Sequence, residues 1–431
     1  VVIADTVGNG ILVTGNNSAP VAVTSGGSTA FVEGSNVAST PVVVDGDITI
    51  ADADNATLAS ATVAITGNFQ GGQDVLAFIN NSAAMGNVSA SYNSGTGVLS
   101  LTSAGATATL AQWEAALRAV TYSNSSDTPD TTSRTISVVV SDGTDSSTAA
   151  TRTVTVTAVN DTPVAVAESM SVSEGGTATT LTGGASSLLA NDTDAENETL
   201  SAVLVTGPAH GTLTLNADGT FSYTHNGGET TTDSFTYKPN DGTADGNTVI
   251  VAISVAPVND APVNTVPGTQ VTAEDTALVF SAGNSNQVVI TDADAGGGQL
   301  DVILSVTNGT LTLAGTTGLT SATGVGTADS PMVFSGTLTD INSALAGLAY
   351  TPTANYHGAA VLSLATSDLG HTGAGGTLTD TDTVNITVNP VNDAPTVATP
   401  LADQNATEDA VFTFTFDANA FADVDVGDAL T

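Results

Sequence analysis

Residues 256–262 read Ala-Pro-Val-Asn-Asp-Ala-Pro, and this sequence indicates how the chain is organised because it recurs along it. Residues 158–163 read Ala-Val-Asn-Asp-Thr-Pro, and residues 389–395 read Asn-Pro-Val-Asn-Asp-Ala-Pro. Each copy follows a segment in which valine or isoleucine occupies alternate positions, as over 249–255, which is the period of a strand with one buried face. A phrase that repeatedly closes one strand-rich block and opens the next predicts a joint between tandem modules.

The joints divide the 431 residues into blocks, and a degenerate joint at 17–20, Asn-Ser-Ala-Pro, precedes the first whole block. We expect a closing strand of a preceding module over 1–18, modules over 19–160, 161–260 and 261–393, and the start of a fourth, incomplete module over 394–431. The joints are named by the modules they connect: the 1/2 joint, the 2/3 joint and the 3/4 joint. The incomplete ends fit either a window cut from a longer tandem array or copies that polymerise by lending a strand. We favour the window, because one strand cannot replace the several that the last block lacks.

Strand signals dominate every block. Apolar residues alternate with Ser and Thr, and Gly, Asn and Asp punctuate the runs, which predicts an all-β chain of two-faced antiparallel sheets. Residues 210–223 predict a hairpin whose turn is Asp218-Gly219, and the Gly, Thr and Ala of 314–330 predict a surface loop. Two stretches, 110–120 and 338–348, instead place apolar residues at helical spacing, so we expect a short helix in modules 1 and 3, with Trp113 in the core.

Carboxylates keep a fixed register about each joint. A Glu follows the joint proline by 11 to 13 residues, an Asp-x-Asp pair begins 30 to 32 residues after the joint Asp, and an Asp in a turn precedes that Asp by 19 or 25 residues. Oxygen ligands at repeated spacing suggest a hard cation. The candidate ligands are Glu33, Asp52, Asp54, Asp142, Asn160, Asp161, Glu174, Asp192, Asp194, Asp241, Asn259, Asp260, Glu274, Asp292, Asp294, Asp368, Asn392, Asp393, Glu408, Asp423 and Asp425.

Composition excludes several classes of protein. A net charge of −39, with four Lys and Arg against 43 Asp and Glu, argues against binding to nucleic acid or an anionic membrane. The sequence has no cysteine for disulfides or soft-metal sites, and no apolar run long enough to span a membrane. The four histidines lie outside catalytic motifs, and Asp-x-Asp pairs that recur in every module argue for structure, since a catalytic pair is needed once. We therefore expect no enzymatic activity.

These residues carry a family resemblance. The Asn-Asp-x-Pro joint, the following Glu, the Asp-x-Asp pair and the Asp-Gly turn resemble the calcium ligands of cadherin repeats. The joint phrase and the run 211–242 resemble the tandem cadherin-like and VCBS-type repeats of large bacterial surface adhesins. The resemblance covers nearly the whole chain. It implies immunoglobulin-like sandwiches in an elongated array, with Ca2+ as the cofactor between neighbours, outside the cell or on the bacterial surface.

The resemblance also assigns ligands to joints. For the 1/2 joint it implies Glu33, Asp142, Asn160, Asp161, Asp192, Asp194 and Asp241. For the 2/3 joint it implies Glu174, Asp241, Asn259, Asp260, Asp292, Asp294 and Asp368, and for the 3/4 joint Glu274, Asp368, Asn392, Asp393, Asp423 and Asp425. The joint before module 1 has Ser18 in place of Asp, so we expect it to bind most weakly.

The function expected from the sequence is a calcium-stiffened extracellular stalk of a bacterial adhesin or of a matrix fibre in a biofilm. Expected partners are calcium and either further copies of the chain or glycans and proteins on a host or neighbouring cell. Two alternatives stay open: a homopolymeric surface filament completed by strand exchange, and a set of carbohydrate-binding modules. Aromatic residues make up only 4% of the chain, which weighs against the carbohydrate alternative.

Overall fold

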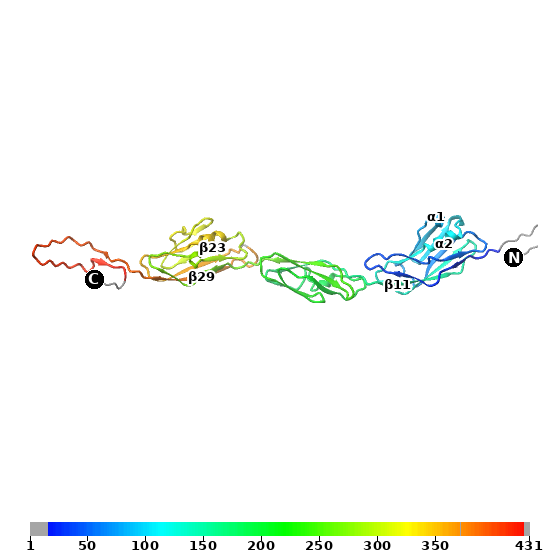
Figure 1. The fold of residues 1–431 in the computed structure, drawn as a ribbon, viewed down its shortest axis with the longest axis horizontal. Helices are drawn as coiled ribbons and strands as arrows, with labels where there is room; N and C mark the ends of the chain where they lie inside the picture. Colours follow the sequence, from blue (N-terminus) through cyan, green and yellow to red (C-terminus); the bar gives the residue numbers. More distant parts are fainter. Residues whose placement is uncertain (1–15, 371, 426–431) are drawn as a thin grey trace, which may run out of the picture.

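The computed structural model describes residues 16–370 and 372–425. Strands and short helices gather around three separate hydrophobic cores, spanning residues 22–156, 165–255 and 280–388. Figure 1 shows the three bodies in a row along the long axis, with a thinner C-terminal segment beyond the third. We call these bodies modules 1, 2 and 3. Most of the closing strand expected over 1–18, residues 1–15, lies outside the described residues.

Module 1 is a sandwich of a large and a small sheet. The large sheet has the order β2-β11-β10-β5-β8-β7, the small sheet the order β3-β9-β6, and β1 pairs with β4. The strands are β1 Val21–Val23, β2 Ser28–Val32, β3 Val42–Val43, β4 Thr49–Ala51, β5 Ser60–Gly67, β6 Asp74–Ala77, β7 Val88–Asn93, β8 Val98–Ser103, β9 Thr121–Asn124, β10 Arg134–Ser141 and β11 Ala150–Thr157. The helices are α1 Ser82–Met85, the 3-10 turn η1 Ala104–Ala106 and α2 Leu110–Arg118.

Module 2 is the smallest sandwich. Its sheets have the orders β12-β18-β17-β14 and β13-β16-β15. The elements are β12 Glu168–Ser173, β13 Thr177–Ala178, η2 Leu188–Asn191, β14 Ser201–Thr206, β15 Gly211–Leu215, β16 Phe221–His225, β17 Thr232–Asn240 and β18 Val249–Ala256. Strands β15 and β16 pair from Gly211 with His225 to Leu215 with Phe221, which confirms the hairpin predicted around Asp218-Gly219.

Module 3 repeats the plan of module 1. Its sheets have the orders β20-β29-β28-β23-β26-β25 and β21-β27-β24, and β19 pairs with β22. The elements are β19 Val263–Thr265, β20 Gln270–Ala273, β21 Leu278–Val279, η3 Ala282–Asn284, β22 Val289–Thr291, β23 Gln299–Val306, β24 Gly309–Thr312, β25 Thr320–Thr323, β26 Met332–Thr337, α3 Leu338–Leu345, β27 Ala349–Pro352, β28 Gly358–Ser367 and β29 Thr379–Asn389. The surface loop predicted over 314–330 is exposed along β25, but it adds that edge strand to the sheet.

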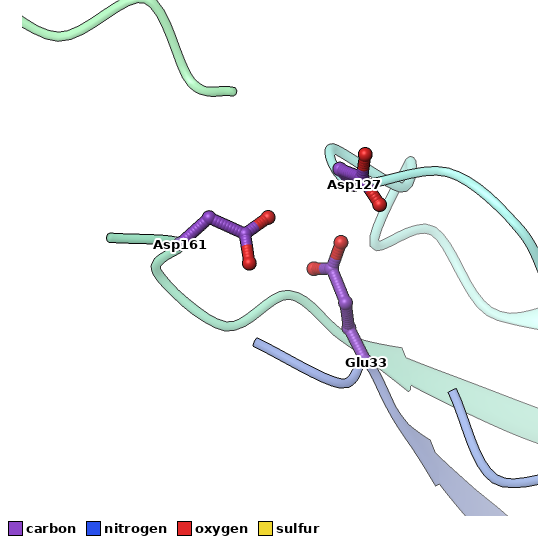
Figure 2. A group of neighbouring side chains, drawn as sticks. All are labelled: Glu33, Asp127 and Asp161. Carbon is purple, nitrogen blue, oxygen red and sulfur yellow. The ribbon is translucent and has the colours of Figure 1, made fainter. Parts of the chain in front are cut away.

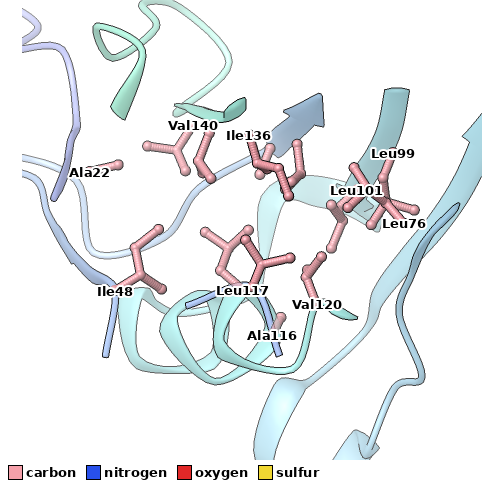
Figure 3. Close-up of a cluster of buried hydrophobic side chains, with 14 of the residues drawn as sticks. Ala22, Ile48, Leu76, Leu99, Leu101, Ala116, Leu117, Val120, Ile136 and Val140 are labelled. Atoms are coloured by element: carbon pink, nitrogen blue, oxygen red, sulfur yellow. The ribbon is translucent and has the colours of Figure 1, made fainter. Parts of the chain in front are cut away.

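The two predicted helices are confirmed as α2 and α3, and both close a sandwich end. Trp113 on α2 is fully buried and donates its indole N–H to the Leu58 carbonyl at 3.0 Å. Figure 3 shows Ala116, Leu117 and Val120 of this segment packed among residues of both sheets. A Glu114 carboxylate oxygen accepts the Ile50 N–H at 2.9 Å, and Asn342 of α3 does the same for Ile290 at 2.9 Å. Each helix therefore supplies a partner for the backbone of a short strand, β4 or β22.

The prediction of purely antiparallel sheets was wrong for one pair in each module. The first strand of the large sheet runs parallel to the last: β2 to β11, β12 to β18 and β20 to β29. Alternation of side chains is the same in both directions, so the sequence pattern does not reveal the difference. Parallel pairing has a consequence for the joints, because both strands of the pair end at the same end of the module.

The last segment holds little regular structure. Strand β30, Thr396–Val397, pairs with β31, Phe421–Ala422. Phe412, Phe414 and Phe416 lie outside strands, and the rings of Phe414 and Phe416 meet edge to face at a centroid distance of 5.2 Å. That this segment begins a fourth module stays a prediction. No helix among the described residues is long and apolar enough to cross a membrane.

Candidate metal centres at the module joints

In each module a glutamate lies at the end of the sandwich that faces the following joint. Glu33, Glu174 and Glu274 directly follow the first strand of their large sheets, and their backbone N–H groups donate to the residues that end the parallel partner strands: to Thr157 at 3.0 Å, Ala256 at 2.9 Å and Asn389 at 2.9 Å. In return, one carboxylate oxygen of each glutamate accepts the N–H of the joint valine, at 3.0, 3.2 and 2.6 Å. The parallel strand pair thus fixes a carboxylate beside the joint that follows it.

The joint aspartate is tied to the next module. The N–H of Asp161 donates to Glu196 at 3.4 Å, that of Asp260 to Asp294 at 3.3 Å, and that of Asp393 to Asp425 at 2.6 Å. Each accepting side chain is the second member of an acid-x-acid pair. The three joints therefore share one backbone contact between the joint and the downstream pair.

The joint asparagine makes a second repeated contact, at the joint before module 1, the 1/2 joint and the 2/3 joint. The amide of Asn17 donates to Asp142 at 2.7 Å, that of Asn160 to Asp241 at 2.9 Å, and that of Asn259 to Asp368 at 2.6 Å. The other oxygen of each aspartate accepts N–H groups of its own turn, as Asp368 accepts those of Gly370 and Leu378. These hydrogen bonds hold the pKa of Asp142 and Asp241 below the usual range; for Asp368 they outweigh burial, which acts to raise its pKa.

Acids from separate loops converge at the two inner joints. At the 1/2 joint, Glu33, Asp127 and Asp161 each offer a carboxylate oxygen within 4.8 Å of the others, and Figure 2 shows the three side chains facing one another. At the 2/3 joint, Glu174, Glu229 and Asp260 make the same arrangement. Two carboxylates at such a distance repel by roughly 3 kcal/mol at an effective dielectric constant of about 20. Folding therefore brings like charges together at each of these joints.

Buried oxygens without a partner show what these clusters lack. Within the described ranges, seven buried carboxylate oxygens accept no hydrogen bond, and all seven belong to acids that the sequence predicted as ligands: Glu33, Asp52, Asp161, Glu174, Asp194, Asp292 and Asp393. Buried polar atoms are normally paired, since an unpaired one costs about 1–3 kcal/mol. A set made only of carboxylate and amide oxygens fits a hard divalent cation and does not suit a soft metal.

Burial and repulsion raise the pKa of the clustered acids. For Glu33 the largest cause is burial, and the charges of Asp161, Glu196 and Asp127 add to it. For Glu229 burial again comes first, followed by the charges of Glu174, Asp294 and Asp260. Burial and the neighbouring Asp294 raise the pKa of Asp292 to about 6. A bound cation would reverse each of these penalties.

The 1/2 joint is open to solvent. A groove of about 720 Å³ lies between modules 1 and 2, and its walls include Asp127 of module 1, Asp161 of the joint and Asp194 of module 2. Its other lining residues are mostly serine, asparagine, threonine and alanine. The groove gives an ion from solution access to the carboxylates.

The middle of the chain matches a known family. Residues 160–257, which make up module 2 with its leading joint, match the bacterial cadherin-like domain. Module 2 is therefore similar to bacterial cadherin-like domains. The resemblance to bacterial cadherin-like repeats is thereby confirmed, and the all-β sandwich fold is confirmed by the sheets of all three modules.

Several solved structures are similar to the chain. Mouse cadherin-23 EC22-24 is 16% identical, with a TM-score of 0.37, and the match covers 87% of this chain and 100% of that one. Mouse protocadherin-24 EC1-3 is 15% identical, with a TM-score of 0.34, and the match covers 88% of this chain and 100% of that one. No curated protein matches the sequence.

The structure corrects the joint to which three predicted ligands belong. Asp142 was expected at the joint that follows its module, and Asp241 and Asp368 were each expected at both the preceding and the following joint. Their contacts with Asn17, Asn160 and Asn259 place them at the joint that precedes. The reason is strand direction: the turn comes before the last strand, which then runs the length of the module to the next joint.

The acid-x-acid pair at the start of module 2 lies two residues later in the structure than predicted. The equivalent pair of module 3 shows this by its hydrogen bond. An Asp292 oxygen accepts the N–H of Asp294, and an Asp194 oxygen accepts that of Glu196 in the same way, at 3.2 and 3.1 Å. Asp192 instead accepts the hydroxyl of Tyr237 at 3.0 Å. The acid-x-acid pair that contacts the 1/2 joint in the structure is therefore Asp194 and Glu196, and Asp192 lies outside it.

Three acids of the clusters were not among the predicted ligands: Glu196, Asp127 and Glu229. Residues 192–196 read Asp-Thr-Asp-Ala-Glu, in which both the pair 192 and 194 and the pair 194 and 196 fit the spacing, so the sequence did not single out Glu196. Asp127 and Glu229 lie five and six residues after Tyr122 and Tyr223, and that recurrence would have found them.

The outermost predicted ligands take different positions. Asp54 accepts the Ser18 N–H at 3.1 Å, and an Asp52 oxygen accepts that of Asp54, so the joint before module 1 repeats the downstream half of the arrangement. An Asp423 oxygen accepts the N–H of Asp425, and the Asn392 amide donates to the Asp393 carbonyl. Glu408 lies exposed in a turn of the last segment, and the described residues place it in none of the clusters.

Proposed function

We propose that this chain is a stiff stalk segment of an extracellular bacterial adhesin or matrix fibre, with Ca2+ held at the joints between its modules. The observation that carries the proposal is the set of buried carboxylate oxygens without partners, which lie at every joint and belong to ligands predicted from spacing alone. The family match of module 2 supports an adhesion-type module at the cell surface and a role without catalysis.

At the 1/2 joint, the residues that would hold the ion come from both neighbours. Glu33 and Asp127 come from module 1, Asp161 from the joint, and Asp194 and Glu196 from module 2. Glu174, Glu229, Asp260, Asp292 and Asp294 would do the same at the 2/3 joint. A bound divalent cation supplies positive charge that turns mutual repulsion into shared attraction.

Stiffness follows from where these ligands are attached. Each glutamate is fixed by a strand pair of one module, and each acid-x-acid pair by its own backbone N–H groups in the next. The segment between modules contains no run of glycine and serine that would act as a flexible linker. With the ligands bound to one ion, we expect neighbouring modules to keep one relative orientation. Without it, repulsion among the same acids favours bending.

Calcium titration of two matched variants tests the proposal. We expect the wild-type chain to bind Ca2+ in the range of about 0.1 to 1 mM, as extracellular modules do. Glu196→Gln should weaken the 1/2 joint about tenfold, because it removes a charged ligand. Asp192→Asn removes the same charge, but Asp192 lies two residues before Asp194 and outside the pair. The calcium affinity of this variant should therefore stay within about twofold of wild type. Calorimetry that finds no calcium binding by the wild-type chain would refute the proposal. Equal losses in the two variants would refute the ligand frame.

A further inference from the structure

Two buried polar residues occupy the same position in modules 1 and 2. Asn124 follows the buried Tyr122 by two residues, and His225 follows the buried Tyr223 by two residues. Asn124 is 3% exposed and His225 is 2% exposed. Burying such a side chain costs free energy unless its polar atoms are paired. Their partners therefore show what the position is used for.

His225 connects the two loops that carry acids of the 2/3 joint. Its Nδ1 accepts the N–H groups of Gly175 and Gly227, both at 3.3 Å, and its Nε2 lies 2.9 Å from the Thr230 hydroxyl. Because both partners of Nδ1 are N–H donors, Nδ1 is the acceptor and Nε2 carries the proton. Gly175 directly follows Glu174, while Gly227 and Thr230 flank Glu229. One imidazole thus holds both glutamate loops.

The backbone of both loops is shaped for this contact. Gly175 has φ of 62° and Gly227 has φ of 77°, in the left-handed region that glycine adopts without strain. The two glycines face each other closely, since a Cβ on Gly175 would lie 3.9 Å from the Gly227 Cα. This close approach lets both N–H groups point at one ring nitrogen.

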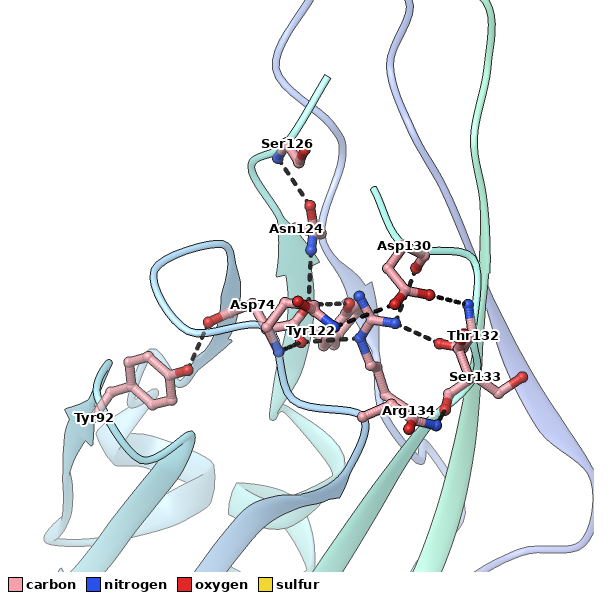
Figure 4. A network of polar contacts seen from close by, with 11 residues as sticks. Asp74, Tyr92, Tyr122, Asn124, Ser126, Asp130, Thr132, Ser133 and Arg134 are labelled. Atoms are coloured by element: carbon pink, nitrogen blue, oxygen red, sulfur yellow. Dashed lines mark hydrogen bonds and ion pairs between the residues drawn. The ribbon is translucent and has the colours of Figure 1, made fainter. Parts of the chain in front are cut away.

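Module 1 holds the loop of Asp127 with a buried ion pair. Asn124 Oδ1 accepts the Ser126 N–H at 2.8 Å, and its amide donates to Asp74 at 2.7 Å. The Arg134 Nε donates to the other Asp74 oxygen at 2.9 Å. Arg134 Nη1 donates to the carbonyls of Asp130, at 2.9 Å, and Thr132. Figure 4 shows this network bonded to Ser126 at one end of the loop that contains Asp127 and to Asp130 and Thr132 at the other.

Module 3 provides the contrast. Pro352 stands two residues after Tyr350, where the other modules have Asn124 and His225. The loop that follows, 353–357, contains no carboxylate. The buried polar residue and the acid on the loop thus occur together in two modules and are both missing from the sequence of the third. This pairing links the buried residue to the acid.

We propose that His225 is a positioning residue that sets Glu229 against Glu174 for metal binding at the 2/3 joint, and that Asn124 with Asp74 and Arg134 does the same for Asp127 at the 1/2 joint. The inference rests on the proposed function, because it concerns the ligands of that same site. The buried residues do not touch the ion; they fix the loops whose acids do.

A double-mutant cycle in the full chain tests His225 with calcium alone as the ligand. Amide resonances of Gly175 and Gly227 report the 2/3 joint, and that of Asn36 reports the 1/2 joint in the same sample. We expect His225→Phe and Glu229→Gln each to weaken the 2/3 joint about tenfold, as removal of supporting groups does. The double variant should lose less than the two single losses combined, because His225 acts in part through Glu229. His225→Gln, which keeps an acceptor and a donor, should restore most of the affinity, and the 1/2 joint should not change.

Three results would overturn the inference: His225→Phe with affinity within twofold of wild type, additive losses in the double variant, or His225→Gln no better than His225→Phe. If His225→Phe does not fold, Thr230→Ala replaces it in the cycle with the same expected pattern. A wild-type chain that binds no calcium would overturn the proposed function as well. A wild-type chain that binds calcium beside an unaffected His225→Phe variant overturns this inference alone.

Discussion

Replacing Asp292 and Asp294 together with asparagine is expected to lower calcium affinity at the 2/3 joint by about 100-fold, or about 2.7 kcal/mol. Asp292 has a buried oxygen without a partner, and Asp294 accepts the N–H of the joint Asp260. The variant therefore loses two charged ligands while asparagine keeps the size of the side chains. Calorimetric titration measures the loss. Module 3 should stay folded, because both residues lie on a loop outside its core.

In saturating calcium the same variant should be less stable than wild type, whereas without calcium it should lose no stability. The pKa of Asp292 in the folded chain is about 6, above the ordinary value of 3.8, so the free energy of unfolding falls as pH rises from about 4 to about 6. At pH 7.5 in EGTA the variant should therefore melt no lower than wild type, whereas in saturating calcium it should melt lower. The control is Asp301→Asn with Asp382→Asn, which removes the same charge from strands β23 and β29. A variant that melts lower than wild type in both conditions would show that the pair supports the sandwich itself.

Trp113→Ala should destabilise module 1 by about 3–5 kcal/mol, the cost of removing a fully buried large aromatic side chain. The substitution opens a cavity between α2 and the sheets and leaves the Leu58 carbonyl without the indole N–H. In a module of this size, the melting temperature should fall by about 10 °C. Scanning calorimetry of the full chain measures this, because the three cores are separate and modules 2 and 3 serve as internal references.

Ile79→Ala in the same module is the matched control. Ile79 is 85% exposed, so the change should stay within about 0.5 kcal/mol. A loss of unfolding free energy below about 1 kcal/mol in Trp113→Ala would contradict the role of α2 in closing the core of module 1.

Local patterns explain why much of the site was predictable. The joint phrase, the glutamate after it and the alternating strands are all encoded within short distances in the sequence. Every buried oxygen without a partner among the described carboxylates belongs to a residue chosen by this spacing. Spacing succeeds there because the glutamate and the joint are each attached directly to a strand end.

The remaining features depend on contacts between distant residues. The direction of β2 relative to β11 does not change side-chain alternation, so parallel pairing left no pattern to detect. The end of the module at which Asp241 lies follows from that same topology. The choice between Asp192 and Asp194 depends on Tyr237, whose hydroxyl holds Asp192. Asp127 and Glu229 sit in loops held by Asn124 and His225, and only folding brings them to the joint.

Small-angle scattering with and without calcium measures the shape of the whole chain, which calcium at the joints should keep straight. With millimolar Ca2+, we predict the pair-distance distribution of one straight rod and a melting temperature raised by mass action. Excess EGTA should shorten the maximum dimension, broaden the distribution and lower the melting temperature, and calcium should restore all three. Identical scattering and melting curves in the two conditions would contradict the account.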